Sequence, residues 1–213
     1  MADTRTCAQC GALFTPRREH ARFCSARCRV AWNREHTGDP QAGADALNWS
    51  IAAMRDATER LASDPVPDHA HGLAVISEAV WWVTLVDATL VRYHHQAYER
   101  ALESQAPDQR GAIEGTFAGL RFVRNQMGYH LEPADFVPPE EGFPGPCHDG
   151  VTAWRWRSLP EPDLGSLPHR GRAWEMRRYL AYQAQLAGHT LGETFGRAVA
   201  FLDLVASHNQ TAA

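Results

Sequence analysis

The sequence predicts a mainly α-helical protein with a small cysteine-rich module at its N-terminus. Four of the five cysteines lie within residues 7–28. From residue 45 onward, apolar side chains recur every three or four residues over most of the chain, the spacing of helices with one buried face. The exception is residues 131–170, where eight of forty residues are proline. We therefore expect a module over residues 1–36, a linker over 37–44, and a helical bundle over 45–213 that carries an insertion at 131–170.

The cysteines of the first module have the spacing of a metal site. Cys7 and Cys10 form a C-x2-C pair, and after thirteen residues Cys24 and Cys28 form a C-x3-C pair. Four thiolates at this spacing can hold a structural zinc ion in tetrahedral geometry. A module of some forty residues buries too little apolar surface to fold alone, so the metal would supply its folding free energy. Clustered cysteines of this kind also indicate a reducing compartment, and the isolated Cys147 is given no role.

The same cysteines, together with Phe14 and the run Phe23-Cys24-Ser25, resemble FCS-type zinc ribbons and treble clefs. Residues 1–36 hold seven arginines against three acids, a net charge of +4. Arginines mixed with an aromatic residue can follow a nucleic-acid backbone and stack a base. The alternative is a solvated basic face over a small aromatic core. The candidate nucleic-acid contacts are Arg17, Arg18, Arg22, Arg27 and Trp32.

Four helices are expected after the linker. Their ranges are Asp45–Ala62, His71–Ser104, Pro107 to near Gly128, and Arg172–Ser207. Small residues recur every four positions in the last helix, which predicts the close approach of another helix because interior glycines otherwise cost stability. These small residues are Ala184, Gly188, Gly192, Gly196 and Ala200.

The third of these helices carries the residues with the clearest chemistry. Ile113, Phe117, Leu120, Val123 and Met127 share one buried face, so Arg121, Arg124 and Asn125 lie off that face. Gly128 and the later Pro133 indicate that the helix ends near Gly128. His130 could then fold back toward Arg124, or face a second copy of the stretch across a dimer.

Cleaving RNA without a metal requires proton transfer and positive charge beside the phosphate. His130 suits proton transfer at neutral pH, Arg124 can hold the phosphate, and Asn125 can orient either group. Arg121 is a further candidate contact to RNA. The alternative is that Arg124 is a solvated charge and His130 a capping or loop residue.

Arg124 and Asn125, followed by four residues and His130, resemble the Arg-x(4–6)-His signature of HEPN domains. Many members of that family are metal-independent endoribonucleases whose composite site lies across a homodimer. The resemblance implies a helical bundle, an RNA substrate and a role of the kind played by toxins and defence effectors. The Leu-Glu-Pro run after His130 and the insertion at 131–170 depart from the family's pattern.

The insertion is either a cover for the bundle or a functional loop. Residues 151–157 alternate as a strand does, which predicts a short β-hairpin. Such a hairpin could close the bundle, or act as a lid that guides single-stranded RNA past Arg155 and Arg157.

The chain carries 21 basic and 25 acidic residues, so it is not a general binder of polyanions. It has no signal pattern and no run of about 18 apolar residues, so we expect a cytoplasmic protein with no membrane contact. The sequence favours a metal-independent endoribonuclease with Arg124, Asn125 and His130 at its site, acting as a homodimer and directed by the zinc module. One alternative is a non-catalytic adaptor whose zinc module binds DNA, RNA or protein. Another is a helical regulator that senses a small molecule.

Overall fold

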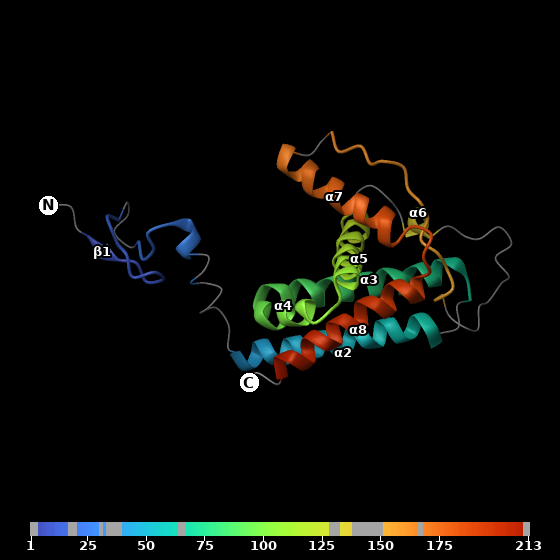
Figure 1. Cartoon of the computed structure of the whole chain (residues 1–213), viewed down its shortest axis with the longest axis horizontal. Helices are drawn as coiled ribbons and strands as arrows, with labels where there is room; N and C mark the ends of the chain where they lie inside the picture. Colours follow the sequence, from blue (N-terminus) through green and yellow to red (C-terminus); the bar gives the residue numbers. More distant parts are fainter. Residues whose placement is uncertain are drawn as a thin grey trace. The chain divides into compact units, whose positions relative to one another are not determined.

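The structure is a computed structural model of the chain. The residues that it describes are 4–16, 21–29, 32, 40–63, 67–127, 133–137, 151–165 and 168–210. The chain divides into two compact units, Met1–Ala46 and Leu47–Ala213. The mainly helical class predicted from the sequence is confirmed, with a small sheet near the N-terminus (Figure 1). Four cysteines also lie close together in the N-terminal unit.

The first unit is built on a short hairpin. Strand β1 (Arg5–Thr6) pairs antiparallel with β2 (Leu13–Phe14), and Arg5 lies opposite Phe14. The connecting loop closes because Gly11 adopts a φ of 72°, which side chains disfavour. A helical turn follows at residues 26–29. Ser25 caps this turn, since its Oγ accepts a hydrogen bond from the backbone N–H of Cys28 at 3.2 Å.

The second unit is a bundle of helices. In Figure 1, α2, α3, α4 and α8 lie in one group, α5 stands against that group, and α7 packs on the far part of α5. The helix bounds are α2 Pro40–Ser63, α3 His69–Tyr93, α4 His95–Glu103, α5 Pro107–Gln126, α6 Pro133–Phe136, α7 His169–Gln185 and α8 Leu191–Gln210.

The contact between α5 and α7 sets the position of the candidate site. A Cβ atom on Gly119 would lie 2.7 Å from Leu186 Cδ1 and 3.1 Å from the backbone Cα of Tyr182. Only glycine permits so close an approach of two helices. Phe122 then packs on Tyr182 with ring centroids 5.5 Å apart. The C-terminal turn of α5 is therefore held firmly beside α7.

The expected long second helix is two helices. α3 ends at Tyr93, His94 leaves the helical conformation with φ −125° and ψ 36°, and α4 begins at His95. The change of direction allows Tyr98 to pack edge-to-face on Phe201 of α8, with centroids 5.1 Å apart. Tertiary packing therefore decides this boundary, and the local sequence contains no glycine or proline to mark it.

The last helix expected from the sequence is also divided into two helices. The predicted close approach of another helix along its small residues is wrong. α7 ends before a turn in which Gly188 has a φ of 79°. Gly188 is therefore part of a turn. A Cβ on Gly192 would meet Thr152 at 3.2 Å, whereas a Cβ on Gly196 would meet nothing within 4 Å. The close helix approach instead uses Gly119 of α5.

The described part of the insertion holds no hairpin. Residues 152–156 run beside the turn between α7 and α8, and the only residue pair assigned as a bridge there is Arg155 with Thr190. Trp156 is buried at 1% exposure and donates its indole N–H to Thr194 Oγ1 at 3.0 Å. Trp156 thus fills the core, which supports a cover for the bundle over a mobile lid.

One further expectation needs correction. Residues 40–44, expected in the linker, belong to α2.

α3 is long and apolar enough, by length and composition alone, to cross a membrane, with a mean hydropathy of 1.5 over its most apolar window. Half of that window is buried within the bundle, as in the core helix of a globular protein.

Candidate functional site

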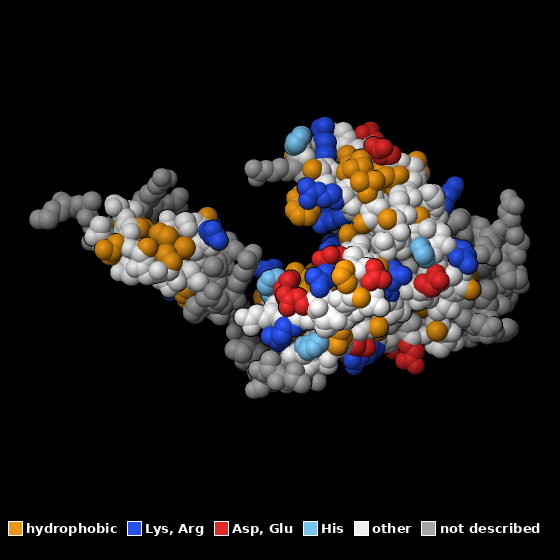
Figure 2. Space-filling model, in the orientation of Figure 1, with side chains coloured by type: hydrophobic (Ala, Val, Ile, Leu, Met, Phe, Trp, Pro, Cys, Tyr) orange, Lys and Arg blue, Asp and Glu red, His pale blue; other side chains and the backbone are white. Residues whose placement is uncertain are grey.

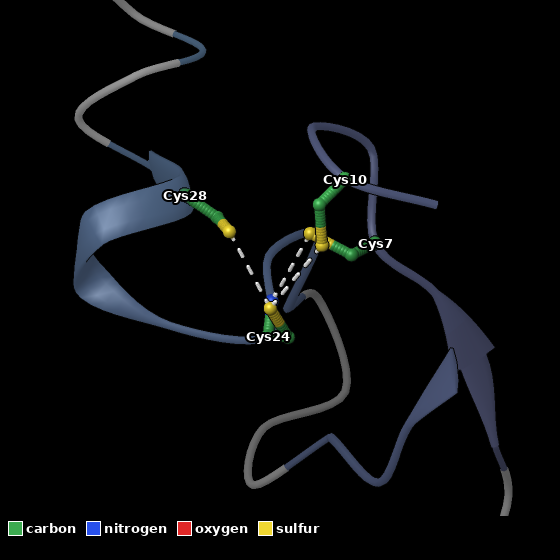
Figure 3. A group of neighbouring side chains, drawn as sticks. All are labelled: Cys7, Cys10, Cys24 and Cys28. Atoms are coloured by element: carbon green, nitrogen blue, oxygen red, sulfur yellow. Dashed lines mark hydrogen bonds between the residues drawn. The ribbon is translucent and has the colours of Figure 1, made fainter. Parts of the chain in front are cut away.

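The four cysteines of the first unit come together, as their spacing predicts (Figure 3). Cys7 and Cys10 lie on the hairpin loop, and Cys24 and Cys28 flank the start of the helical turn. Their four sulfur atoms lie within 4.8 Å of one another. These four cysteines are called the cysteine cluster below.

The geometry of the cysteine cluster fits a tetrahedral metal ion. A zinc–sulfur bond of about 2.3 Å implies sulfur atoms roughly 3.8 Å apart around the ion. The Sγ atom of Cys24 lies 3.7 Å from that of Cys10 and 3.5 Å from that of Cys28. The backbone N–H of Cys24 donates to Cys7 Sγ at 3.4 Å, which is how a coordinating thiolate is supported.

The electrostatics of the cluster also favour a cation. The hydrogen bond from the backbone of Cys24 lowers the pKa of Cys7 to about 6. The neighbouring sulfurs, Cys28 first, raise the pKa of Cys24 to about 12. Four thiolates cannot all ionise at this separation without positive charge between them. A divalent cation would supply that charge.

The predicted nucleic-acid contacts of the first unit are only partly placed. Arg17 and Arg18 lie outside the described residues. Arg27 is exposed on the helical turn. The guanidinium of Arg22 lies 4.5 Å from the ring centroid of Trp32, and Phe23 lies 5.7 Å from the same ring. Trp32 is therefore already packed between protein groups, which favours the small aromatic core.

In the second unit, three arginines gather beside the C-terminal turn of α5. Arg121 and Arg124 come from α5, and Arg178 comes from α7. The side chains of Arg121 and Arg178 are 29% and 30% exposed, so they are held by the protein but open to solvent. These three residues are called the arginine cluster below. His130 lies outside the described residues, four positions after Gln126, the last residue of α5.

Glu175 of α7 organises one side of the arginine cluster. This carboxylate is 6% exposed and accepts from Gln126 Nε2 at 2.9 Å and from Arg178 Nη1 at 3.1 Å. Its Oε2 also accepts from Asn125 Nδ2 at 3.4 Å. Asn125 in turn accepts from Arg124 Nη2 at 3.2 Å. Asn125 thus links Arg124 to Glu175 and fixes the direction of the guanidinium.

Asp87 of α3 organises the other side. It is fully buried, accepts from Arg121, and accepts from the hydroxyl of Tyr98 at 2.9 Å. Burial raises the pKa of Asp87, against the opposing effects of Arg121 and Tyr98. Burial and the charge of Asp87 also raise the pKa of Tyr98. Arg121, predicted as an RNA contact, is therefore first of all the partner of a buried carboxylate.

Arg124 differs from Arg121 and Arg178 because it forms no ion pair with a carboxylate among the described residues. Its pKa is lowered, first by burial and then by the charges of Arg178 and Arg121, against the smaller opposing effects of Asp87 and Glu175. Its side chain donates a hydrogen bond to the neutral amide of Asn125. Such a group gains most from an anion, because an anion would offset both the repulsion and the lost hydration.

The arginine cluster can be reached from solvent, because the side chains of Arg121, Arg124 and Arg178 are only partly buried. Figure 2 shows a notch in the second unit between α7 and the group of helices that includes α4. α5 packs on both α7 and α3. A phosphate group that reached the arginine cluster would meet guanidinium groups from two helices.

Sequence reasoning missed Arg178, Glu175 and Asp87. Each is brought to α5 by helix packing across 34 or more residues of sequence, so the motif around Arg124 could not indicate them. The spacing of Glu175 and Arg178 by three residues predicts a pair on one helix, but not what that pair contacts.

No protein-family model, curated protein or solved structure matches this chain. The chemistry of the two clusters therefore carries the functional argument.

Proposed function

We propose that the protein is a metal-independent endoribonuclease whose scissile phosphate binds at the arginine cluster. The observation that carries the proposal is the half-buried Arg124, which two other arginines crowd and which Asn125 holds in place. The proton-transfer group of the proposal is the imidazole of His130. It is proposed from the sequence motif that places His130 after Arg124 and Asn125, and from the resemblance of this motif to HEPN domains.

The proposed reaction is transesterification within the RNA chain. The 2′-oxygen forms a bond to phosphorus, the bond from phosphorus to the 5′-oxygen breaks, and a 2′,3′-cyclic phosphate remains. One proton leaves the 2′-hydroxyl and one reaches the departing 5′-oxygen, and imidazole can carry out either transfer near neutral pH. Arg124 and Arg178 would stabilise the charge that builds on the phosphate oxygens.

Two copies of the chain would supply two His130 side chains, one as base and one as acid. The proposal therefore includes a homodimer, which gel filtration with light scattering tests directly. If a monomer cleaves RNA, a single His130 must serve the reaction, and the proposed division into one base and one acid from two chains is wrong.

The reaction is tested with RNA and with DNA of the same sequence, in the presence of EDTA. We expect cleavage of the RNA alone, with cyclic phosphate ends, and loss of cleavage in His130→Ala. Cleavage of the DNA, or RNA products with 3′-hydroxyl ends, would contradict this mechanism. Because EDTA can strip the cysteine cluster, the assay is repeated without EDTA in a buffer freed of other divalent ions.

We further propose that the cysteine cluster holds one structural zinc ion, with Cys7, Cys10, Cys24 and Cys28 as ligands. Thiolates select zinc over magnesium or calcium, and four of them leave no open coordination position for catalysis. Metal analysis of the purified chain should find one zinc per chain, lost in Cys24→Ser. Iron in its place would correct the metal but not the site.

The second candidate is an adaptor in which the first unit recognises nucleic acid. The net charge of +4 over residues 1–36 favours it. If the adaptor is correct, Cys7→Ser abolishes binding of RNA or DNA and the wild-type chain cleaves neither. If the nuclease is correct, Cys7→Ser retains cleavage at high substrate concentration.

A further inference from the structure

We infer that Trp174 of α7 stacks an unpaired base of the RNA bound at the arginine cluster, so that the substrate is single-stranded. This inference rests on the proposed function and deepens it by naming the class of RNA.

Trp174 is not used by the interior of the protein. It is 62% exposed, whereas Glu175 beside it is 6% exposed and Tyr182 on the same helix is buried completely. Leu180 of the same helix is also exposed, at 57%. A large indole facing water on a helix whose other face packs on α5 indicates a contact surface.

Trp174 lies on the flank of α7 that borders the arginine cluster. Residues four positions apart on a helix are separated by roughly 40° around the axis and about 6 Å along it. Trp174 therefore shares a flank with Arg178, a member of the cluster. Tyr179 marks the opposite flank, where it packs on Phe122 with centroids 5.7 Å apart.

An arginine side chain also lies over the indole of Trp174. The guanidinium of Arg177 lies 5.2 Å from the ring centroid of Trp174. Arginine beside an exposed aromatic ring is the combination that binds single strands, because the ring stacks the base and the cations attract the backbone.

The charge of α7 favours an anionic occupant. α7 contains four arginines and a single acidic residue, Glu175, which is buried against α5. The acidic Glu161 and Asp163 of the preceding segment line a hollow with Arg172. A second copy of the chain docking through this face would bring the same cations together. A nucleotide combines a flat apolar base with an anionic phosphate, and so complements both Trp174 and the arginines.

Stacking on Trp174 requires a base that is not stacked within a duplex. Side chains do not reach the base faces of an RNA helix, whereas the bases of loops and single strands can turn outward. The site should therefore discriminate between the two forms of RNA.

The test measures the affinity of the full zinc-loaded chain for a fluorescent single-stranded RNA and for a duplex of the same length, at one fixed salt concentration. Trp174→Ala should weaken single-strand binding by roughly 5- to 150-fold, the range found for one base stacked on an aromatic ring. Duplex binding should change little. Trp174→Phe, which keeps an aromatic face, should restore most of the lost affinity.

The matched control is Trp49→Ala. Trp49 is 64% exposed on α2, a helix that contributes no member of the arginine cluster, and it contacts Trp82 of α3. Its replacement should leave both affinities unchanged. Thermal unfolding of each variant shows that the helices remain folded.

A second readout is tryptophan fluorescence. Single-stranded RNA should quench the wild-type chain more than the Trp174→Phe chain, because the stacked indole is missing from the latter.

Three results would overturn the inference. In the first, the Trp174→Ala chain binds single-stranded RNA with the affinity of the wild type. In the second, Trp174→Ala lowers the affinities for single-stranded and duplex RNA equally. In the third, Trp174→Ala changes the oligomeric mass of the protein, so that Trp174 lies in a dimer contact. If the wild-type chain cleaves RNA in any of these cases, only the role of Trp174 fails. A wild-type chain that neither binds nor cleaves RNA would overturn the proposed function as well.

Discussion

At the scale of the residue, the arginine cluster contains two kinds of arginine. Arg121 neutralises the buried Asp87, and Arg178 pairs with Glu175. Among the described residues, Arg124 forms no ion pair and donates to the neutral amide of Asn125, while Arg178 and Arg121 repel its charge more than Asp87 and Glu175 attract it. A partly buried cation in a repulsive environment, held in a fixed direction, indicates a site for an anion.

This difference predicts that Arg121→Ala and Arg124→Ala change the free energy of unfolding by very different amounts. Arg121→Ala would leave the carboxyl of Asp87 unpaired in the interior and should cost about 3 kcal/mol, since breaking a buried ion pair costs about that much. Arg124→Ala removes a charge that Arg121 and Arg178 repel, so the free energy of unfolding should stay within about 0.5 kcal/mol of the wild type. Urea denaturation measures both.

The control for Arg121 is the double variant Arg121→Ala with Asp87→Asn. It removes the orphaned charge and should recover part of the loss. A large destabilisation by Arg124→Ala would instead make Arg124 a structural residue and remove the basis for the proposed site.

At the scale of the element, the packing of α5 on α7 fixes the site, and glycine makes that packing close. The predicted close approach at glycines of the last helix is wrong, because Gly188 forms a turn. The start of α8 after this turn has a local sequence signal. Thr190 and Glu193 form a reciprocal capping box, with Glu193 accepting from the N–H of Thr190 at 2.9 Å and donating its own N–H to Thr190 Oγ1 at 3.1 Å.

Substitution of two glycines on α5 tests the helix contact. Gly119→Ala should destabilise the protein by about 1–3 kcal/mol, because its Cβ would overlap Leu186 and press on the backbone of Tyr182. Gly111→Ala meets nothing within 4 Å and should stabilise the helix by up to about 1 kcal/mol. The Tm values of Gly119→Ala and Gly111→Ala measure the two effects. Equal effects of the two substitutions would mean that α5 and α7 do not meet at Gly119.

The capping box predicts a dependence of stability on pH. The hydrogen bond from the backbone N–H of Thr190 lowers the pKa of Glu193 below its ordinary value of 4.5. A lowered folded-state pKa means that the stabilisation is present above the unfolded pKa and is lost as pH falls through the folded pKa. The difference in Tm between wild type and Glu193→Gln should therefore be present at pH 7 and shrink below about pH 4.5. A difference that stays constant down to pH 3 would exclude the ionised carboxylate as its cause.

At the scale of the whole molecule, sequence reasoning worked where the signal is local. The spacing of four cysteines predicted the cysteine cluster, and helical periodicity predicted the bundle and the burial of Phe117, Leu120 and Val123. Sequence reasoning failed where contacts between distant segments determine a helix boundary or the surroundings of a side chain. The break at His94 depends on packing between Tyr98 and Phe201, and the environment of Arg124 depends on Glu175 of another helix.

The central claim is that Arg124 holds the phosphate that reacts, and the single-turnover rate of RNA cleavage tests it most directly. The rate is measured at saturating RNA for the wild type, for Arg124→Ala and for the control Arg55→Ala, which removes an exposed arginine that pairs with Asp203. Removing one group that stabilises the charge of the transition state lowers rates by about 100- to 1000-fold. The account predicts a loss of that size for Arg124→Ala and a wild-type rate for Arg55→Ala. Equal rates for Arg124→Ala and the wild type would contradict it.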